Sequence, residues 1–152
     1  MTTSDRHPSR DLPGLPSHRR DQVVRRIARD HLVRRATAER WFEELDKFLN
    51  ICAFAEEPVA PPSRVDKAWH TFILFTRDYA SYCASRHGIF IHHDPYEKKD
   101  AQAYERAYRE ALVRHGDLPR GIWPAPGAQS GGWGIGGGAG GCGGGGCGGG
   151  GC

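Results

Sequence analysis

The chain has 152 residues, of which 38% are hydrophobic, with 21 lysines and arginines against 18 aspartates and glutamates. This size and composition leave room for one modest hydrophobic core, which excludes a multidomain protein. No stretch approaches the roughly 18 uninterrupted apolar residues of a membrane helix, and the polar start of the chain is unlike a secretion signal. We therefore expect a cytoplasmic protein without a membrane partner, whose five cysteines are thiols rather than a disulfide framework.

Glycine divides the chain into unlike parts. Of the 21 glycines, 17 lie between Gly127 and Cys152, whereas residues 1–16 contain three prolines and few apolar side chains. Neither end can offset the entropy of ordering by burying apolar surface. We expect disorder over 1–16, one folded domain over 17–124, and a disordered low-complexity tail over 125–152.

The first expected helix, about residues 17–34, is amphipathic and rich in arginine. Apolar positions share one of its faces and three arginines share the other: Val23, Val24, Ile27 and His31 against Arg25, Arg26 and Arg29. The arginines form either a solvated face or a phosphate-binding patch. We favour the solvated face over nucleic-acid binding, because no reading helix, aromatic platform or zinc finger accompanies them.

A second helix is expected after a cap at Thr37, and a third after a cap at Ser63. The apolar positions of the second recur with the helical period of 3.6: Trp41, Phe42, Leu45, Phe48, Leu49 and Cys52. Pro58, Pro61 and Pro62 end this helix and impose an extended connection. The third helix has its own apolar stripe, formed by Val65, Trp69, Phe72 and Ile73.

We expect the third helix to break near Phe75, because Thr76 followed by Asp78 is typical of a helix start. A fourth helix, about 76–86, would bury Tyr79, Tyr82 and Cys83, and Gly88 suits the left-handed residue that follows a helix. A short β-prone run, Ile89–Ile91, and the turn at Asp94–Pro95 lead to a last helix that ends before Gly116. Trp123 and Pro124 then return to the bundle. The elements predict an all-α fold, a single compact bundle of about five helices.

Metal-ligand residue types gather in the most apolar part of the sequence. Asp66 and His70 stand four apart, so they share a helix face, and His92, His93 and Asp94 follow one another. Two histidines and one carboxylate with open positions suit a divalent metal, either zinc or non-haem ferrous iron. The candidate ligands are His70, His92, His93 and Asp66, with Trp69, Tyr79 and Asp94 as supporting residues. The alternative is a hydrogen-bonded Asp66–His70 pair that holds no ion, beside histidines that face solvent.

The metal hypothesis depends on the break at Phe75. One continuous helix would place Gly88 about 27 Å beyond His70, at 1.5 Å per residue. An extended return from Gly88 to His93 covers only about 17 Å. The histidines can therefore meet only if the helix reverses between them.

Two strings, VDKAWHTFILFTRDYASYC at 65–83 and GIFIHHDP at 88–95, resemble the shared block of the glycine-rich domain-containing protein-like family of bacteria and plants. The likeness covers about residues 20–124, and the glycine tail fits the family's name. The resemblance implies a domain of unsettled biochemical activity, whose plant members are associated with growth and stress responses. The matching positions are Asp66, Trp69, His70, Tyr79, His92 or His93, and Asp94. Plant members often read WHxH, and Phe72 stands here at the second His.

The tail carries Cys142, Cys147 and Cys152 at intervals of five, a spacing that matches no zinc ribbon or finger. Three thiols on a flexible glycine chain can collect soft metals, form disulfides or be modified, which would give the tail a protein or metal partner. The alternative is a low-complexity expansion with incidental thiols.

We expect a binding or interaction module rather than an enzyme, built on the His/Asp cluster and the thiol-bearing tail. A small metalloenzyme using the same cluster, with Asp94 or Tyr79 as proton carrier, is the first alternative. A nucleic-acid adaptor using the first helix is the second. A thiol enzyme is disfavoured, because Cys83 and His87 have no orienting third group or oxyanion donors, and no residue is assigned a catalytic role.

Overall fold

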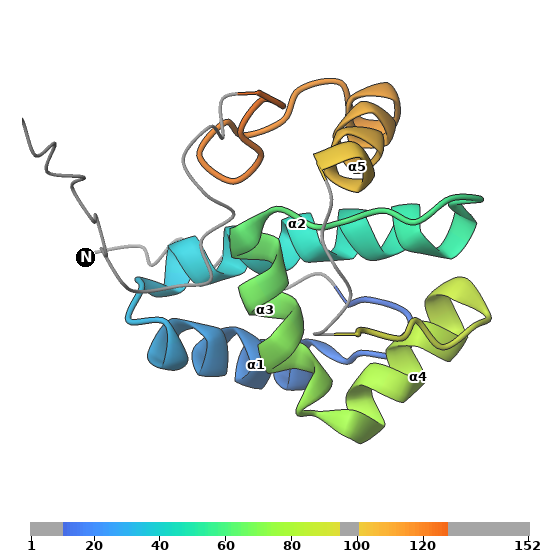
Figure 1. Cartoon of the computed structure of the whole chain (residues 1–152). Helices are drawn as coiled ribbons and strands as arrows, with labels where there is room; N and C mark the ends of the chain where they lie inside the picture. The colour runs from blue at the N-terminus through green and yellow to red at the C-terminus, as the bar shows by residue number, and fades with distance from the viewer. Residues whose placement is uncertain (1–10, 95–100, 128–152) are drawn as a thin grey trace, which may run out of the picture.

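A computed structural model describes residues 11–94 and 101–127, and over these ranges it confirms the all-α bundle (Figure 1). In chain order the helices are α1 (Ser17–Asp30), α2 (Arg35–Phe54), α3 (Ser63–Ile73), α4 (Thr76–His87) and α5 (Ala101–His115). No strand occurs in the described ranges, and the β-prone run at 89–91 is irregular. None of the helices described here combines the length and apolar character that crossing a membrane requires.

The helices begin differently from the expected side-chain caps. Ser63 and Thr76, expected as caps, are the first helical residues, as is Ser17, and the positions before all three make no side-chain cap bond. Proline precedes α1 and α3 in an extended conformation that already sets the direction of entry. The Asp11 carboxylate instead accepts the N–H of Ser17 at 2.8 Å. The second helix starts at Arg35, before Thr37, so the cap expected there is also wrong.

The predicted break between the third and fourth helices is confirmed. The helix α3 ends at Ile73, and Phe75 has φ −86° and ψ 63°, outside helical geometry. The next helix starts at Thr76 and ends before Gly88, whose φ of 72° is the left-handed conformation expected there. The chain therefore turns back on itself between His70 and His93.

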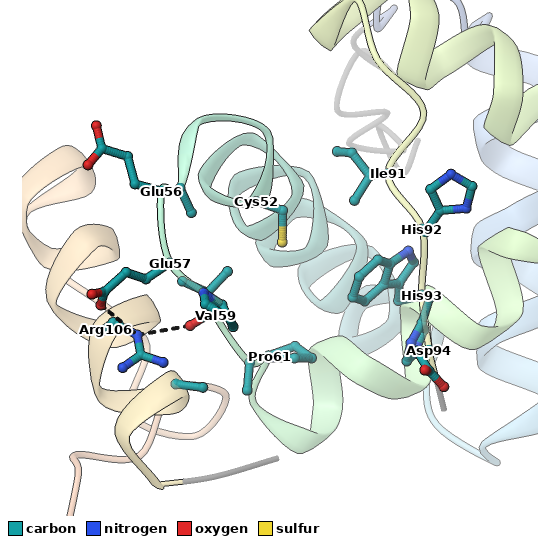
Figure 2. A pocket seen from close by; sticks show the side chains of 15 residues that line it. Cys52, Glu56, Glu57, Val59, Pro61, Ile91, His92, His93, Asp94 and Arg106 are labelled. Carbon is teal, nitrogen blue, oxygen red and sulfur yellow. Dashed lines mark hydrogen bonds and ion pairs between the residues drawn. The ribbon is translucent and has the colours of Figure 1, made fainter. Parts of the chain in front are cut away.

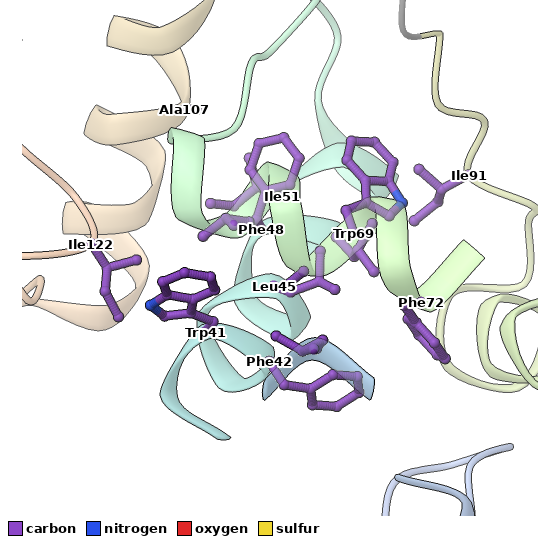
Figure 3. Close-up of a cluster of buried hydrophobic side chains, with 14 of the residues drawn as sticks. Trp41, Phe42, Leu45, Phe48, Ile51, Trp69, Phe72, Ile91, Ala107 and Ile122 are labelled. Carbon is purple, nitrogen blue, oxygen red and sulfur yellow. The ribbon is translucent and has the colours of Figure 1, made fainter. Parts of the chain in front are cut away.

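The core forms around α2, which contacts α1, α3 and α5 (Figure 1). Figure 3 shows apolar side chains of α2 between two groups of neighbours. On one side lies α3, and on the other lie α5 and Ile122. Phe72 of α3 is fully buried and joins the layers, because its ring lies 5.3 Å from Phe42 of α2 and 5.3 Å from Tyr82 of α4. The apolar stripes predicted for α2 and α3 are thus the faces that meet.

The folded part begins before Ser17. Leu15 donates its N–H to the carbonyl of Leu12 at 2.8 Å across Pro13 and Gly14, and Gly14 has φ +73°. Proline followed by a left-handed glycine is the signature of a type II turn. The turn buries Leu15 completely. Disorder was expected over 1–16, and residues 1–10 of that segment lie outside the described ranges.

The segment after α5 returns to the bundle as predicted. Trp123 is fully buried, and its indole N–H donates to the Glu44 carboxylate of α2 at 2.8 Å. The Tyr104 hydroxyl of α5 donates to the carbonyl of Pro124 at 2.7 Å. These bonds tie the segment after α5 to both neighbouring helices. The tail thiols, Cys142, Cys147 and Cys152, lie outside the described ranges.

A buried polar group closes the end of α4. The Asp46 carboxylate of α2 accepts bonds from the Tyr82 hydroxyl at 2.5 Å and from Arg86 at 2.7 Å. The two ring nitrogens of neighbouring His87 are enclosed and have no hydrogen-bond partner among the described residues. Burial, and next the charge of Arg86, lower the pKa of His87, while Asp46 acts in the opposite direction.

This environment makes stability depend on pH. The unfolded chain protonates His87 near its ordinary pKa of about 6.5, whereas the folded chain resists the proton until a lower pH. We expect the contribution of neutral His87 to be complete above pH 6.5 and to be lost as the pH falls below it. Urea unfolding between pH 7 and 5 should show the wild type losing stability faster than His87→Phe. Parallel curves for the two proteins would contradict this account.

Candidate metal centre

Packing of α3 places two candidate ligands at the edge of the bundle. Val65, Trp69 and Phe72 form the buried stripe of this helix. Asp66 and His70 therefore lie together at the margin of that stripe, one helical turn apart. The Asp66 side chain is 16% exposed and the His70 side chain is 50% exposed, so the pair lies at the surface.

The segment after α4 is held against α3 by Tyr79. The buried Tyr79 hydroxyl donates to the carbonyl of Ile91 at 2.6 Å and accepts the indole N–H of Trp69 at 2.9 Å. Ile91 is buried as a result of this docking. Two residues further on, the His93 ring stacks on the Trp69 indole, with centroids 4.2 Å apart and planes at 22°. His93 is thereby fixed beside Asp66 and His70.

The three side chains form a group that can accept a metal ion. Nε2 of His93 lies 3.0 Å from Oδ1 of Asp66, and the rings of His70 and His93 have centroids 4.4 Å apart. One ligand atom from each of the three residues lies within 4.8 Å of the other two. The His93 side chain is only 6% exposed, so the group is buried on one side and open on the other.

Nδ1 is the ring nitrogen of His70 that faces the Asp66 side chain, and it lies 3.6 Å from Oδ1 of Asp66. Nδ1 of His70 lies 2.7 Å from the backbone carbonyl of Asp66, and a carbonyl can only accept, so this nitrogen carries the proton. In a neutral His70 ring the lone pair is then on Nε2, so an ion would be bound through this nitrogen. Histidines that bind metals are usually oriented by such a bond from their other ring nitrogen.

A family model described as UCP032817-like matches residues 16–114, which is more than half of the chain. The chain belongs to the UCP032817-like family. No curated protein and no solved structure gives a significant match. The expected membership of the glycine-rich domain-containing protein-like family is therefore wrong. The match ends before the glycine tail, so the composition that suggested that name plays no part in it.

Phe72 stands where plant members of that other family often have a second histidine. A histidine at that position would lie in the core of this UCP032817-like domain, because Phe72 is fully buried and its ring lies 5.1 Å from that of Tyr79. The second histidine of the WHxH pattern would therefore not join the surface group of Asp66, His70 and His93. Of the two histidines that follow α4, His93 joins the group.

The other predicted site residues lie around the group. His92 is exposed, its ring packs on Phe90 with centroids 4.9 Å apart, and it is not one of the three grouped residues. Asp94 is exposed at the end of the same segment. Tyr79 and Trp69 are buried supports. Burial raises the pKa of the Tyr79 hydroxyl, which is already engaged in two hydrogen bonds, so the structure gives no support to Tyr79 as a proton carrier.

A pocket of about 490 Å³ adjoins the group, and Trp69 and His93 are among the residues that line it (Figure 2). It is bounded by the Pro58–Pro61 connection, by Ala103 and Arg106 of α5, and by the 91–94 segment. Cys52 projects into it from α2 (Figure 2). Burial raises the pKa of the Cys52 thiol to about 12, so the thiol itself is neutral.

Sequence reasoning missed this pocket and the part of Arg106 in it. The Nε of Arg106 donates to the carbonyl of Pro58 at 2.9 Å, which fixes the connection against α5. The run of prolines signalled an extended connection, but nothing in the sequence indicated which helix would lie opposite it. Arg106 and Pro58 are 48 positions apart in the chain, so their contact is set by tertiary packing.

The arginines of α1 are paired with acidic side chains. Every arginine of this helix has a carboxylate at salt-bridge distance; the partners are Asp78 for Arg19, Glu43 for Arg20, Asp21 for Arg25, and Asp30 for Arg26 and Arg29. These carboxylates offset much of the positive charge of the helix. The structure therefore adds no argument for a phosphate-binding surface on α1.

Proposed function

We propose that this domain is a metal-dependent binding module in which Asp66, His70 and His93 hold one divalent ion. One observation carries the proposal: residues 27 positions apart on two segments bring three ligand atoms within 4.8 Å. Support comes from Trp69 and Tyr79, because the stacked ring and the two hydrogen bonds fix His93 before any ion arrives. Such preorganisation favours a binding site over a chance cluster.

The donor set defines the kind of ion. Two imidazoles and one carboxylate are ligands for zinc and for ferrous iron, and a three-residue set leaves at least one position for an outside ligand. The half-exposed side chain of His70 keeps that part of the group accessible. Asp66 and His93 also attract one another without an ion, and in that case they act as a polar clamp between α3 and the 88–94 segment.

A binding role is preferred to a metalloenzyme that uses Tyr79 as its proton carrier. The pKa of Tyr79 is raised by burial, and both its lone pair and its proton are engaged within the fold. A hydroxyl held in this way does not exchange protons with a substrate. The thiols at 142, 147 and 152 would serve as a separate attachment for a partner.

Zinc analysis of the untagged, full-length protein tests the proposal. After exposure to zinc and exhaustive dialysis, we expect about one equivalent in the wild type and less than a tenth of that in His70→Ala. His92→Ala is the matched control, since it removes a neighbouring exposed imidazole outside the group, and it should keep the metal. The triple variant Cys142→Ser, Cys147→Ser, Cys152→Ser should keep it as well.

The tail variant separates the two sources of metal binding. Zinc that disappears with the tail thiols and remains in His70→Ala would contradict an internal site. Equal loss in His70→Ala and His92→Ala would show that any surface imidazole contributes, and the geometry of the three-residue group would then be irrelevant.

A further inference from the structure

The pocket beside the three-residue group has the character of a small-molecule site. Its volume of about 490 Å³ is within the range of ligand pockets, which runs from roughly 300 to 1,000 Å³. Much of its wall is apolar and includes Cys52, Val59, Pro61, Trp69 and Ile91. The polar residues stand at its two ends, Arg106 with Glu57 at one and His93 with Asp94 at the other (Figure 2). An apolar body with a polar end fits this arrangement.

The pocket and the metal-ligand group share a side chain. His93 lines the pocket and also lies 3.0 Å from Asp66 in the group. Trp69, stacked on His93, lines the pocket as well. A molecule in the pocket is therefore next to the ring that would hold the ion.

We propose that this pocket binds a small organic molecule with an apolar body and one oxygen donor group, and that the donor completes the coordination of the ion. The inference rests on the proposed metal site and adds the class of ligand to it. In this arrangement the donor oxygen occupies the open coordination position of the ion, and the pocket encloses the apolar body of the molecule.

Charge makes this binding depend on the metal. Among the residues that line the pocket, the carboxylates are those of Glu56, Glu57 and Asp94, and the guanidinium is that of Arg106. Arg106 lies 3.5 Å from Glu57, so its charge is partly offset. The wall is therefore acidic overall and repels an anionic donor until a divalent ion is present. The neutral thiol of Cys52 adds no charge to the apolar wall.

Benzohydroxamic acid is a suitable probe, because it joins an apolar ring to a metal-binding oxygen pair. Calorimetric titration of the full-length protein should show binding at least ten times tighter with zinc than without it. Benzamide, which has the ring and lacks the chelating pair, should bind at least ten times more weakly. Cys52→Phe fills the pocket and should reduce probe affinity at least tenfold while zinc content stays unchanged. Val59→Phe is the second pocket-filling variant if the first fails to fold.

The outcomes separate this inference from the metal site itself. Zinc-loaded protein that does not bind the probe overturns the ligand inference and leaves the metal site intact. A folded, zinc-loaded Cys52→Phe or Val59→Phe protein that binds the probe like the wild type places it outside the pocket, which also overturns the inference. Equal affinity with and without zinc excludes coordination by the ion. Failure to bind zinc in the first place removes the metal site and this inference together.

Discussion

Gly14→Ala is expected to lower the free energy of unfolding by about 3 kcal/mol, a large loss for a position near the chain end. Gly14 has φ +73°, where an alanine is strained by roughly 1–2 kcal/mol. An added Cβ would also lie 2.3 Å from the Ser81 carbonyl oxygen and 2.7 Å from its carbon. Because both are backbone atoms of α4, the turn that buries Leu15 would have to move away. Urea unfolding followed by circular dichroism measures the loss.

Gly88→Ala is the matched control for this prediction. Gly88 has nearly the same dihedral angle, φ +72°, but an added Cβ meets nothing within 4 Å. Only the conformational strain remains, and the expected loss is about 1 kcal/mol. The difference between the two variants isolates the collision with α4. Equal losses would mean that the turn at residues 12–15 does not pack against α4 as described.

Tyr79→Phe should affect both stability and metal binding. The change removes the hydroxyl that joins Trp69 to the Ile91 carbonyl, and it leaves a buried indole N–H and a buried carbonyl without that partner. We expect a loss of about 2 kcal/mol in the free energy of unfolding. Zinc affinity should fall about tenfold, because the segment that positions His93 is released from α3. Competition with a zinc-binding dye measures the affinity.

Tyr82→Phe distinguishes this positioning role from general destabilisation. Tyr82 is another buried tyrosine of α4, and its hydroxyl donates to Asp46 at 2.5 Å, on the side of α2. Its loss should destabilise the fold by a comparable amount without changing zinc affinity. If both variants bind zinc equally, Tyr79 supports the fold and does not position the metal group.

Periodicity and helix punctuation were sufficient to predict the bundle. The stripes of α2 and α3 are local patterns, and burial of Phe42 and Phe72 confirms the faces assigned to them. The break before α4 was also predictable, because Thr76 followed two residues later by Asp78 is a local helix-start signal. The starts of the helices were less predictable. Prolines at positions 16 and 62 set the chain direction there, without the expected side-chain caps.

The candidate site was only partly predictable. Asp66 and His70 share a helix face for reasons of spacing, whereas the choice between His92 and His93 depends on the register of an extended segment, in which successive side chains point to opposite sides. That register is fixed by the bond from Tyr79 to Ile91, a tertiary contact. The pocket depends on the docking of α5 near Pro58, which no local pattern specifies.

X-ray absorption at the zinc edge of the loaded, full-length protein tests the central claim most directly. The three-residue group predicts a shell of nitrogen and oxygen at about 2.0–2.1 Å, with the outer-shell signal of two imidazoles and no sulfur. A sulfur shell at about 2.3 Å would contradict it, because the group consists of two histidines and an aspartate and the metal would then be bound by cysteine thiolates elsewhere.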